Sequence, residues 1–229
     1  MTRLDAAPAV QVRWTVVLVE VVAGVLATLL AVALLTMASG RPMRAGATMA
    51  PSIRRDAIVW VGGGAPTRGA VMVLAPDIRW RGATVDEPGP LTRAARWLRL
   101  DNPPEGSRVL VRVIGMPGDV VVSDGRAITV NDLDVPAVPI QGHRFRVVVP
   151  QGRHFVMTDR PSAMSSACYL SALGADALVP TDHLVGRVRG VGQPWTSRSL
   201  TQSASPYTGI AGRAAPTTAT VDAGKDPTC

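Results

Sequence analysis

Residues 108–135 read RVLVRVIGMPGDVVVSDGRAITVNDLDV, and the predicted architecture is built around this stretch. Valine alternates with other residues over 109–113, and such alternation is typical of a β-strand. Glycine and proline at 115–118 interrupt the strand with a tight corner, and Asp124-Gly125 marks a hairpin turn between two further strands. The stretch therefore predicts a β-hairpin unit that is entered through a stiff corner.

Residues 112–119, RVIGMPGD, match a signature motif of the type I signal peptidases, and the chain resembles that family. Val130-Asn131 falls where the family has Val-Asn-Gly, with Asp132 at the glycine. The resemblance implies a mainly β domain with short helices, preceded by one N-terminal transmembrane helix. It also implies that the protein acts on the signal peptides of exported proteins and needs neither a cofactor nor a metal.

The segment from Thr15 to Ala38 is apolar apart from Glu20. A helix rises ~1.5 Å per residue, so this segment is long enough to cross ~30 Å of hydrocarbon. The apolar part of a cleaved secretory signal has only about 7–15 residues. An uncleaved anchor over 14–38 is therefore predicted in preference to a cleaved signal, with a short N-terminal segment, 1–13, before it.

Arginines lie on both sides of this span, so charge alone does not set its orientation. The family resemblance implies a single-pass protein of the cell membrane with most of the chain outside the cytoplasm. The net charge of +7 suits contact with anionic membrane lipid. No nucleic-acid motif occurs, and nucleic acid is not an expected partner.

The remaining chain divides into a domain with an insertion and a tail. The domain covers 39–192, and further strands are predicted at 145–149, 154–157 and 184–191. Within it, 78–107 departs from the family pattern and contains LTRAARWLRL, which predicts a short amphipathic helix. That helix either packs on the sheet or rests on the membrane surface. Few large apolar residues occur over 193–229, which predicts a disordered tail.

GATMAPSI, from Gly46 to Ile53, resembles the family segment whose serine attacks the scissile peptide bond. Thr48 stands at the serine position. The resemblance implies an oxyanion site at the Thr48 backbone N–H, with Gly46 upstream. Met49 and Pro51 match the family pattern and are expected to contact the substrate.

GAVMVLAP, over 69–76, reads as a buried or half-buried strand and resembles the family strand that binds the substrate. The resemblance implies that this strand pairs with an extended peptide through its backbone. Val71 and Val73 are the residues expected at that contact.

The general base of the family is a lysine, which precedes the arginine of the signature. Val111 occupies that position, and Arg112, the signature arginine, does not lose its proton at ordinary pH. The only lysine in the chain is Lys225, in the predicted tail. In the last family motif Asp159 keeps its place and Ser165 approximates a serine, so both are expected to support the site. The Ser-Lys dyad is thus not retained.

Three histidines are candidate substitutes for the missing base: His143, His154 and His183. No sequence feature assigns any of them to the site. A non-catalytic family member that binds exported precursors or assists an active paralogue is the favoured hypothesis. The alternatives are an endopeptidase that uses Thr48 with an unidentified base, and an inert scaffold protein of the cell envelope.

Overall fold

The computed structural model of the protein describes residues 14–75, 109–135, 142–160, 165–192, 198–199, 207 and 209–224. The chain divides into two units, one up to Ser39 and one from Gly40 onward. The predicted N-terminal segment 1–13, the insertion 78–107 and the helix within it lie outside the described residues.

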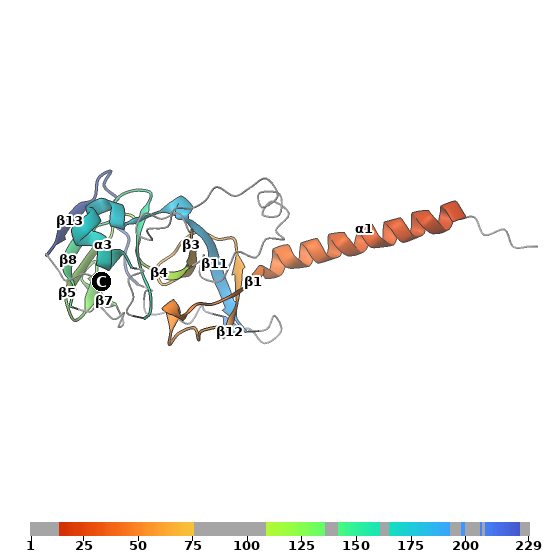
Figure 1. Ribbon diagram of the computed structural model, residues 1–229. Helices are drawn as coiled ribbons and strands as arrows, with labels where there is room; N and C mark the ends of the chain where they lie inside the picture. Colours follow the sequence, from red (N-terminus) through yellow and green to blue (C-terminus); the bar gives the residue numbers. More distant parts are fainter. Residues whose placement is uncertain are drawn as a thin grey trace, which may run out of the picture. The chain divides into compact units, whose positions relative to one another are not determined.

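The first unit contains helix α1 (Trp14–Ser39), which covers the predicted segment 14–38 (Figure 1). The helix contains no proline, and its described side chains, 17–32, are exposed. Among the residues that the structure describes, no helix is both long enough and apolar enough to cross a membrane.

The larger sheet of the second unit has the strand order β1-β2-β11-β3-β4-β9-β10, with β12 also paired to β11, within the described part of the chain (Figure 1). Its neighbouring strands are antiparallel. β3 lies between β11 and β4, so both of its edges are occupied. The strands are β1 (Arg41–Arg44), β2 (Ile58–Gly62), β3 (Val71–Leu74), β4 (Val109–Gly115), β9 (Arg153–Met157), β10 (Val179–Pro180), β11 (Leu184–Val191) and β12 (Arg198–Ser199).

The smaller sheet has the order β13-β8-β5-β6-β7. The hairpin predicted at Asp124-Gly125 is confirmed, because β5 and β6 pair on either side of it. Short helices connect the strands of the second unit, and the prediction of a mainly β fold is confirmed. The remaining elements are β5 (Val120–Asp124), β6 (Ile128–Val130), β7 (Leu133–Val135), β8 (Arg144–Val148), β13 (Thr220–Ala223), α3 (Ser166–Leu173), η1 (Ala47–Met49), η3 (Gly174–Ala177) and η4 (Thr181–His183).

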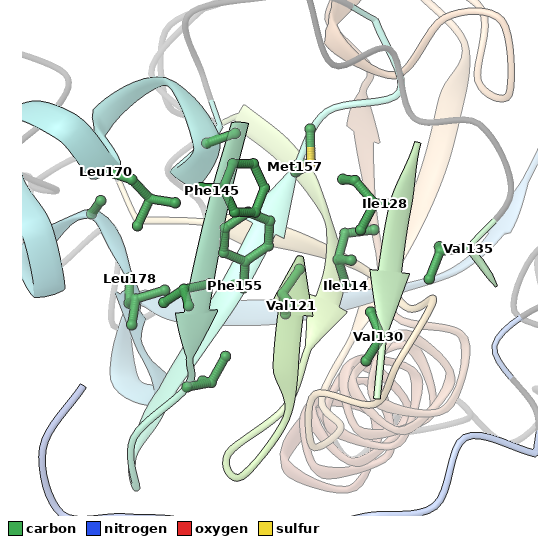
Figure 2. Packing of buried hydrophobic residues seen from close by; sticks show 14 of the residues in the cluster. Ile114, Val121, Ile128, Val130, Val135, Phe145, Phe155, Met157, Leu170 and Leu178 are labelled. Carbon is green, nitrogen blue, oxygen red and sulfur yellow. The ribbon is translucent and has the colours of Figure 1, made fainter. Parts of the chain in front are cut away.

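The largest buried cluster joins the smaller sheet to β9 and α3 (Figure 2). At its centre the rings of Phe145 and Phe155 lie with their centroids 5.3 Å apart. The cluster also contains Ile114 of β4 and Leu170 of α3, so the two sheets and this helix share one core.

Two further clusters cover the opposite faces of β3 and β4. Successive side chains of a strand point to opposite faces of the sheet. Accordingly Leu110 packs with Val71 and Val73 on one face, whereas Val111 packs with Met72 on the other. This alternation fixes the surroundings of every candidate site residue on these strands.

The prediction of a disordered tail over 193–229 does not hold for 209–224. β13 pairs with β8 from Thr220 to Ala223, and Ile210 is 7% exposed in the largest cluster. Backbone pairing orders this segment although it offers few apolar side chains, which is why composition alone failed to predict it.

Candidate functional site

The candidate nucleophile lies on a loop that backbone hydrogen bonds close. Ala45 N–H donates to the Ala57 carbonyl at 2.9 Å, and Ile53 N–H donates to the Met49 carbonyl at 2.8 Å. Met49 and Ile53 are 0% and 1% exposed, and they anchor the loop in the core. The two apolar anchors and the closing bonds fix the conformation of η1, which lies between them.

Thr48 is half-buried, and its hydrogen bonds go to two other segments of the domain. Its Oγ1 donates to the Leu110 carbonyl at 3.2 Å, and its own carbonyl accepts from Arg160 N–H at 3.0 Å. The hydroxyl therefore lies at the peptide bond that joins Leu110 to Val111. The structure brings the two dyad positions of the family to neighbouring places, but the partner of the hydroxyl is a carbonyl oxygen rather than a base.

Val111, at the base position, is 0% exposed. It lies opposite Met72 of β3. Val111 packs in a cluster of buried apolar residues. They are Ala70, Met72, Leu74, Val109, Val111, Val113, Val156, Val179 and Leu184.

Arg112 and Asp159 form a buried, two-pronged ion pair beside this position. Arg112 Nε donates to Oδ1 of Asp159 at 2.7 Å and Nη2 donates to Oδ2 at 2.5 Å, while Nη1 donates to the Gly69 carbonyl at 2.8 Å. Burial acts to lower the pKa of Arg112, but the Asp159 carboxylate outweighs it and the pKa is raised. Arg112 is thus a fixed cation that holds the segment leading to Arg160, whose N–H meets Thr48.

Three of the four residues expected to contact a substrate are core residues. Met49, Val71 and Val73 are at most 2% exposed and pack in one cluster, so their side chains present no surface to a ligand. Pro51 alone is exposed. The expectation that β3 pairs with a peptide is also corrected, since β11 and β4 occupy both of its edges.

Part of β4 is paired with a described strand on one side only, although its residues are buried. One side of β4 pairs with β3 from Val109 to Arg112. On the other side, β9 pairs only with the residues from Arg112 to Gly115. Over Val109–Val111, no strand among the described residues covers that second side. The Leu110 carbonyl, which accepts from Thr48, belongs to this stretch.

The two remaining predicted site residues differ in their surroundings. Gly46 precedes η1, is exposed, and has no atom within 4 Å of where a Cβ would lie. Ser165 is 4% exposed at the start of α3, and its hydroxyl donates to Sγ of Cys168 at 3.3 Å. Gly46 stays beside the nucleophile position, whereas Ser165 has its contact within α3.

Among the described hydrogen bonds, none joins a histidine to the Thr48 hydroxyl. The one described hydrogen bond of the Thr48 hydroxyl goes to Leu110. His154 is 2% exposed with Nε2 3.0 Å from Thr181 Oγ1, and burial lowers its pKa to about 4. His183 contacts Asp182. Within the described residues, no group of three or more His, Cys, Asp or Glu side chains is arranged to hold a metal ion.

Comparison with known families gives a match over residues 17–192 to the family described as signal peptidase, peptidase S26. The match covers most of the chain, and the protein belongs to this family. No curated protein matches the chain. Family membership makes this a signal peptidase-like protein, and signal peptides are the substrates that the family implies.

Proposed function

We propose that this chain is a non-catalytic signal peptidase-like protein that binds the signal peptides of exported proteins. One observation is the main support for the proposed loss of catalytic activity. The Thr48 hydroxyl donates its hydrogen to the Leu110 carbonyl, while the neighbouring base position holds the fully buried Val111. Loss of general-base assistance alone costs about 10²–10⁴ in rate.

Peptide binding does not need the missing base. An extended peptide binds by hydrogen bonds to an unpaired strand edge. Beside Thr48, the stretch Val109–Val111 has one side that no described strand pairs. Its residues are at most 7% exposed, so a peptide would reach this edge only after displacing the contact between Thr48 and Leu110. In this proposal the signal peptide lies along β4 and not along β3, and its residues near the cleavage point face Thr48.

The proposal includes an anchor in the cell membrane, with most of the chain outside the cytoplasm. It is supported by the length of the segment from Thr15 to Ala38 and by its single ionisable residue, Glu20. Family membership supports the outward placement. Such an anchor would hold the nucleophile loop close to the bilayer surface, because few residues separate Ala38 from Gly46.

The test combines a cleavage assay with a crosslinking assay on the full-length protein in vesicles. We expect no cleavage of a preprotein by the wild type or by Thr48→Ala. A photoreactive side chain at Gly46 should crosslink to a signal peptide, because this exposed position accepts a side chain without a clash. Met49 and Val71 are unsuitable for the probe because both are buried.

The matched control carries the same probe at Gly63, which is also exposed and unobstructed. Equal labelling from both positions, or equal labelling of a scrambled peptide, would exclude specific binding and leave the inert scaffold. Preprotein cleavage that Thr48→Ala abolishes would instead establish an endopeptidase with a base outside the contacts described above.

A further inference from the structure

Residues beyond the family match are bound to the corner that carries the family signature. The match ends at residue 192, and the described C-terminal residues are 207 and 209–224 apart from the short β12. Three backbone carbonyls of this segment accept hydrogen bonds from the domain. Arg68 Nη1 donates to Ile210 at 2.8 Å, Asn131 Nδ2 donates to Ala211 at 2.9 Å, and Gln151 N–H donates to Pro216 at 2.8 Å.

The two side-chain donors are themselves held in place by Asp119, the last residue of the signature. Asp119 is 0% exposed and accepts Nε and Nη2 of Arg68 at 2.7 and 2.5 Å. It also accepts Met116 N–H at 2.7 Å and Asn131 Nδ2 at 2.9 Å. Because charge-assisted, bidentate bonds fix geometry, Asp119 orients the Arg68 guanidinium, and its single bond to Asn131 holds that amide beside the C-terminal segment.

The corner also has the shape that this segment requires. Gly118 has φ +90°, and a Cβ there would clash with the Arg213 carbonyl oxygen. Only glycine therefore allows the chain to pass so close to the corner. The donors Arg68 and Asn131 and the space left by Gly118 therefore all serve the same short stretch of C-terminal backbone.

The same segment reaches the candidate functional site. Tyr207 is 6% exposed, and burial raises the pKa of its phenol to about 12, with Asp159 adding to the shift and Arg112 opposing it. Tyr207 also packs in one buried cluster with Met157, which lies two residues before Asp159. On the other side, the residue after Arg68 is Gly69, whose carbonyl accepts Arg112 Nη1.

We propose that Arg68, Asn131 and Gln151 form a binding site for the backbone carbonyls of an extended peptide, and that the C-terminal segment of the same chain, described at 207 and 209–216, occupies it as a strap. The strap positions the Arg112–Asp159 pair, and through it the Arg160 N–H that holds Thr48. This role is independent of what the Thr48 site binds.

Limited trypsin digestion of the full-length protein tests the strap, with cleavage after Arg213 followed by mass spectrometry. The bond after Arg213 should be cut at least about tenfold more slowly in the native protein than in the urea-unfolded chain. Arg68→Lys removes the fork that joins Asp119 to Ile210, and should speed this cleavage about tenfold, as expected for one lost hydrogen bond. Arg126→Lys, at an exposed hairpin position, is the matched control and should leave the rate unchanged.

Hydrogen exchange tests the positioning role and covers the case in which Arg68→Lys does not fold. Tyr207→Ala should lower the protection of the Arg160 and Ile53 amides, whereas Tyr207→Phe should keep it, since packing is retained. Native cleavage after Arg213 as fast as in the unfolded chain would overturn the strap. A released strap with unchanged Arg160 exchange would overturn the positioning role.

Discussion

In the proposal above, position 111 on β4 is the place from which a base would serve the Thr48 hydroxyl. A lysine there would be surrounded by apolar side chains, and burial lowers the pKa of an amine. The protein holds this place with valine, which satisfies packing and removes the base. Catalysis and close packing therefore compete at one residue.

Val111→Lys should destabilise the domain by several kcal/mol at pH 7. The pKa of the buried amine lies below its value of about 10.4 in the unfolded chain. The loss should therefore grow as the pH falls below that value, because the unfolded state then binds the extra proton. Urea denaturation between pH 6 and pH 10 measures it, with Val111→Met as the uncharged control of similar length. A pH-independent loss equal to that of Val111→Met would show that the amine stays charged.

Restored cleavage requires both dyad positions. Thr48→Ser alone should remain inactive, because the hydroxyl still lacks a base. Thr48→Ser combined with Val111→Lys should give measurable preprotein cleavage near pH 8, where a part of the buried amine is neutral. Activity in Thr48→Ser alone would contradict this explanation.

A second residue-scale effect comes from His154, which is buried without its full set of partners. Thr181 Oγ1 donates to the Gly152 carbonyl, so His154 Nε2–H is the donor in its contact with Thr181. Nδ1 has no partner among the described residues. The ring is thus buried in its neutral form, and its pKa is lowered from 6.5 to about 4.

The lowered pKa makes stability depend on pH. The contribution of His154 is complete above pH 6.5 and is lost as the pH falls towards 4, because only the unfolded state then takes up the proton. The loss is about 3 kcal/mol. His154→Gln keeps a donor for Thr181 but does not titrate, so its stability should fall less over this interval. Parallel curves from pH 7 to pH 4 for the two proteins would contradict this prediction.

At the scale of elements, the Arg112–Asp159 pair joins β4 to the segment after β9. Its side chains are 5% and 9% exposed, so removal of one partner leaves a buried charge. Asp159→Asn should cost about 3–5 kcal/mol in the free energy of unfolding. Asp176→Asn, which breaks the more exposed pair with Arg153, should cost about 1 kcal/mol or less. Comparable losses in denaturant titrations would mean that the Arg112 pair contributes no more than a surface pair.

The strands themselves could be predicted from local pattern, but their neighbours could not. The predicted strand at 184–191 is β11, and the corner and hairpin of 108–135 are confirmed. That β11 lies beside β3 depends on residues more than a hundred positions apart, which periodicity does not encode. For this reason peptide binding was predicted at β3, although β11 and β4 pair with both of its edges.

The candidate site likewise has a part that the sequence predicts and a part that it does not. Thr48, Val111 and Arg112 were assigned by their place in a motif, and their roles stay predictions. In the structure the Thr48 hydroxyl contacts the carbonyl of Leu110, the residue before Val111. The carbonyls of Leu110 and Gly69, which hold Thr48 and Arg112, are backbone groups with no signature in the sequence. Val71 and Val73 were predicted to contact a substrate. A strand pattern does not show which face of the strand is buried in the core, and both side chains lie on a buried face.

At the scale of the whole molecule, the proposed anchor predicts a defined topology. Reporters that are active only outside the cytoplasm, fused after Gly40 and at the C-terminus, should both be active. The expectation follows from family membership and from the apolar segment 14–38, because flanking arginines do not set the orientation. If both fusions were inactive, the proposed topology would be wrong.

The contact between Gly118 and Arg213 affects how this protein should be shortened. A fragment ended at residue 192, where the family match stops, would retain every motif and still be incomplete. The buried places of Tyr207 and Ile210 would be uncovered, and β8 would lose β13 and become an exposed edge, which invites aggregation. A fragment of this domain should therefore extend at least to residue 224, beyond the boundary that the family match sets.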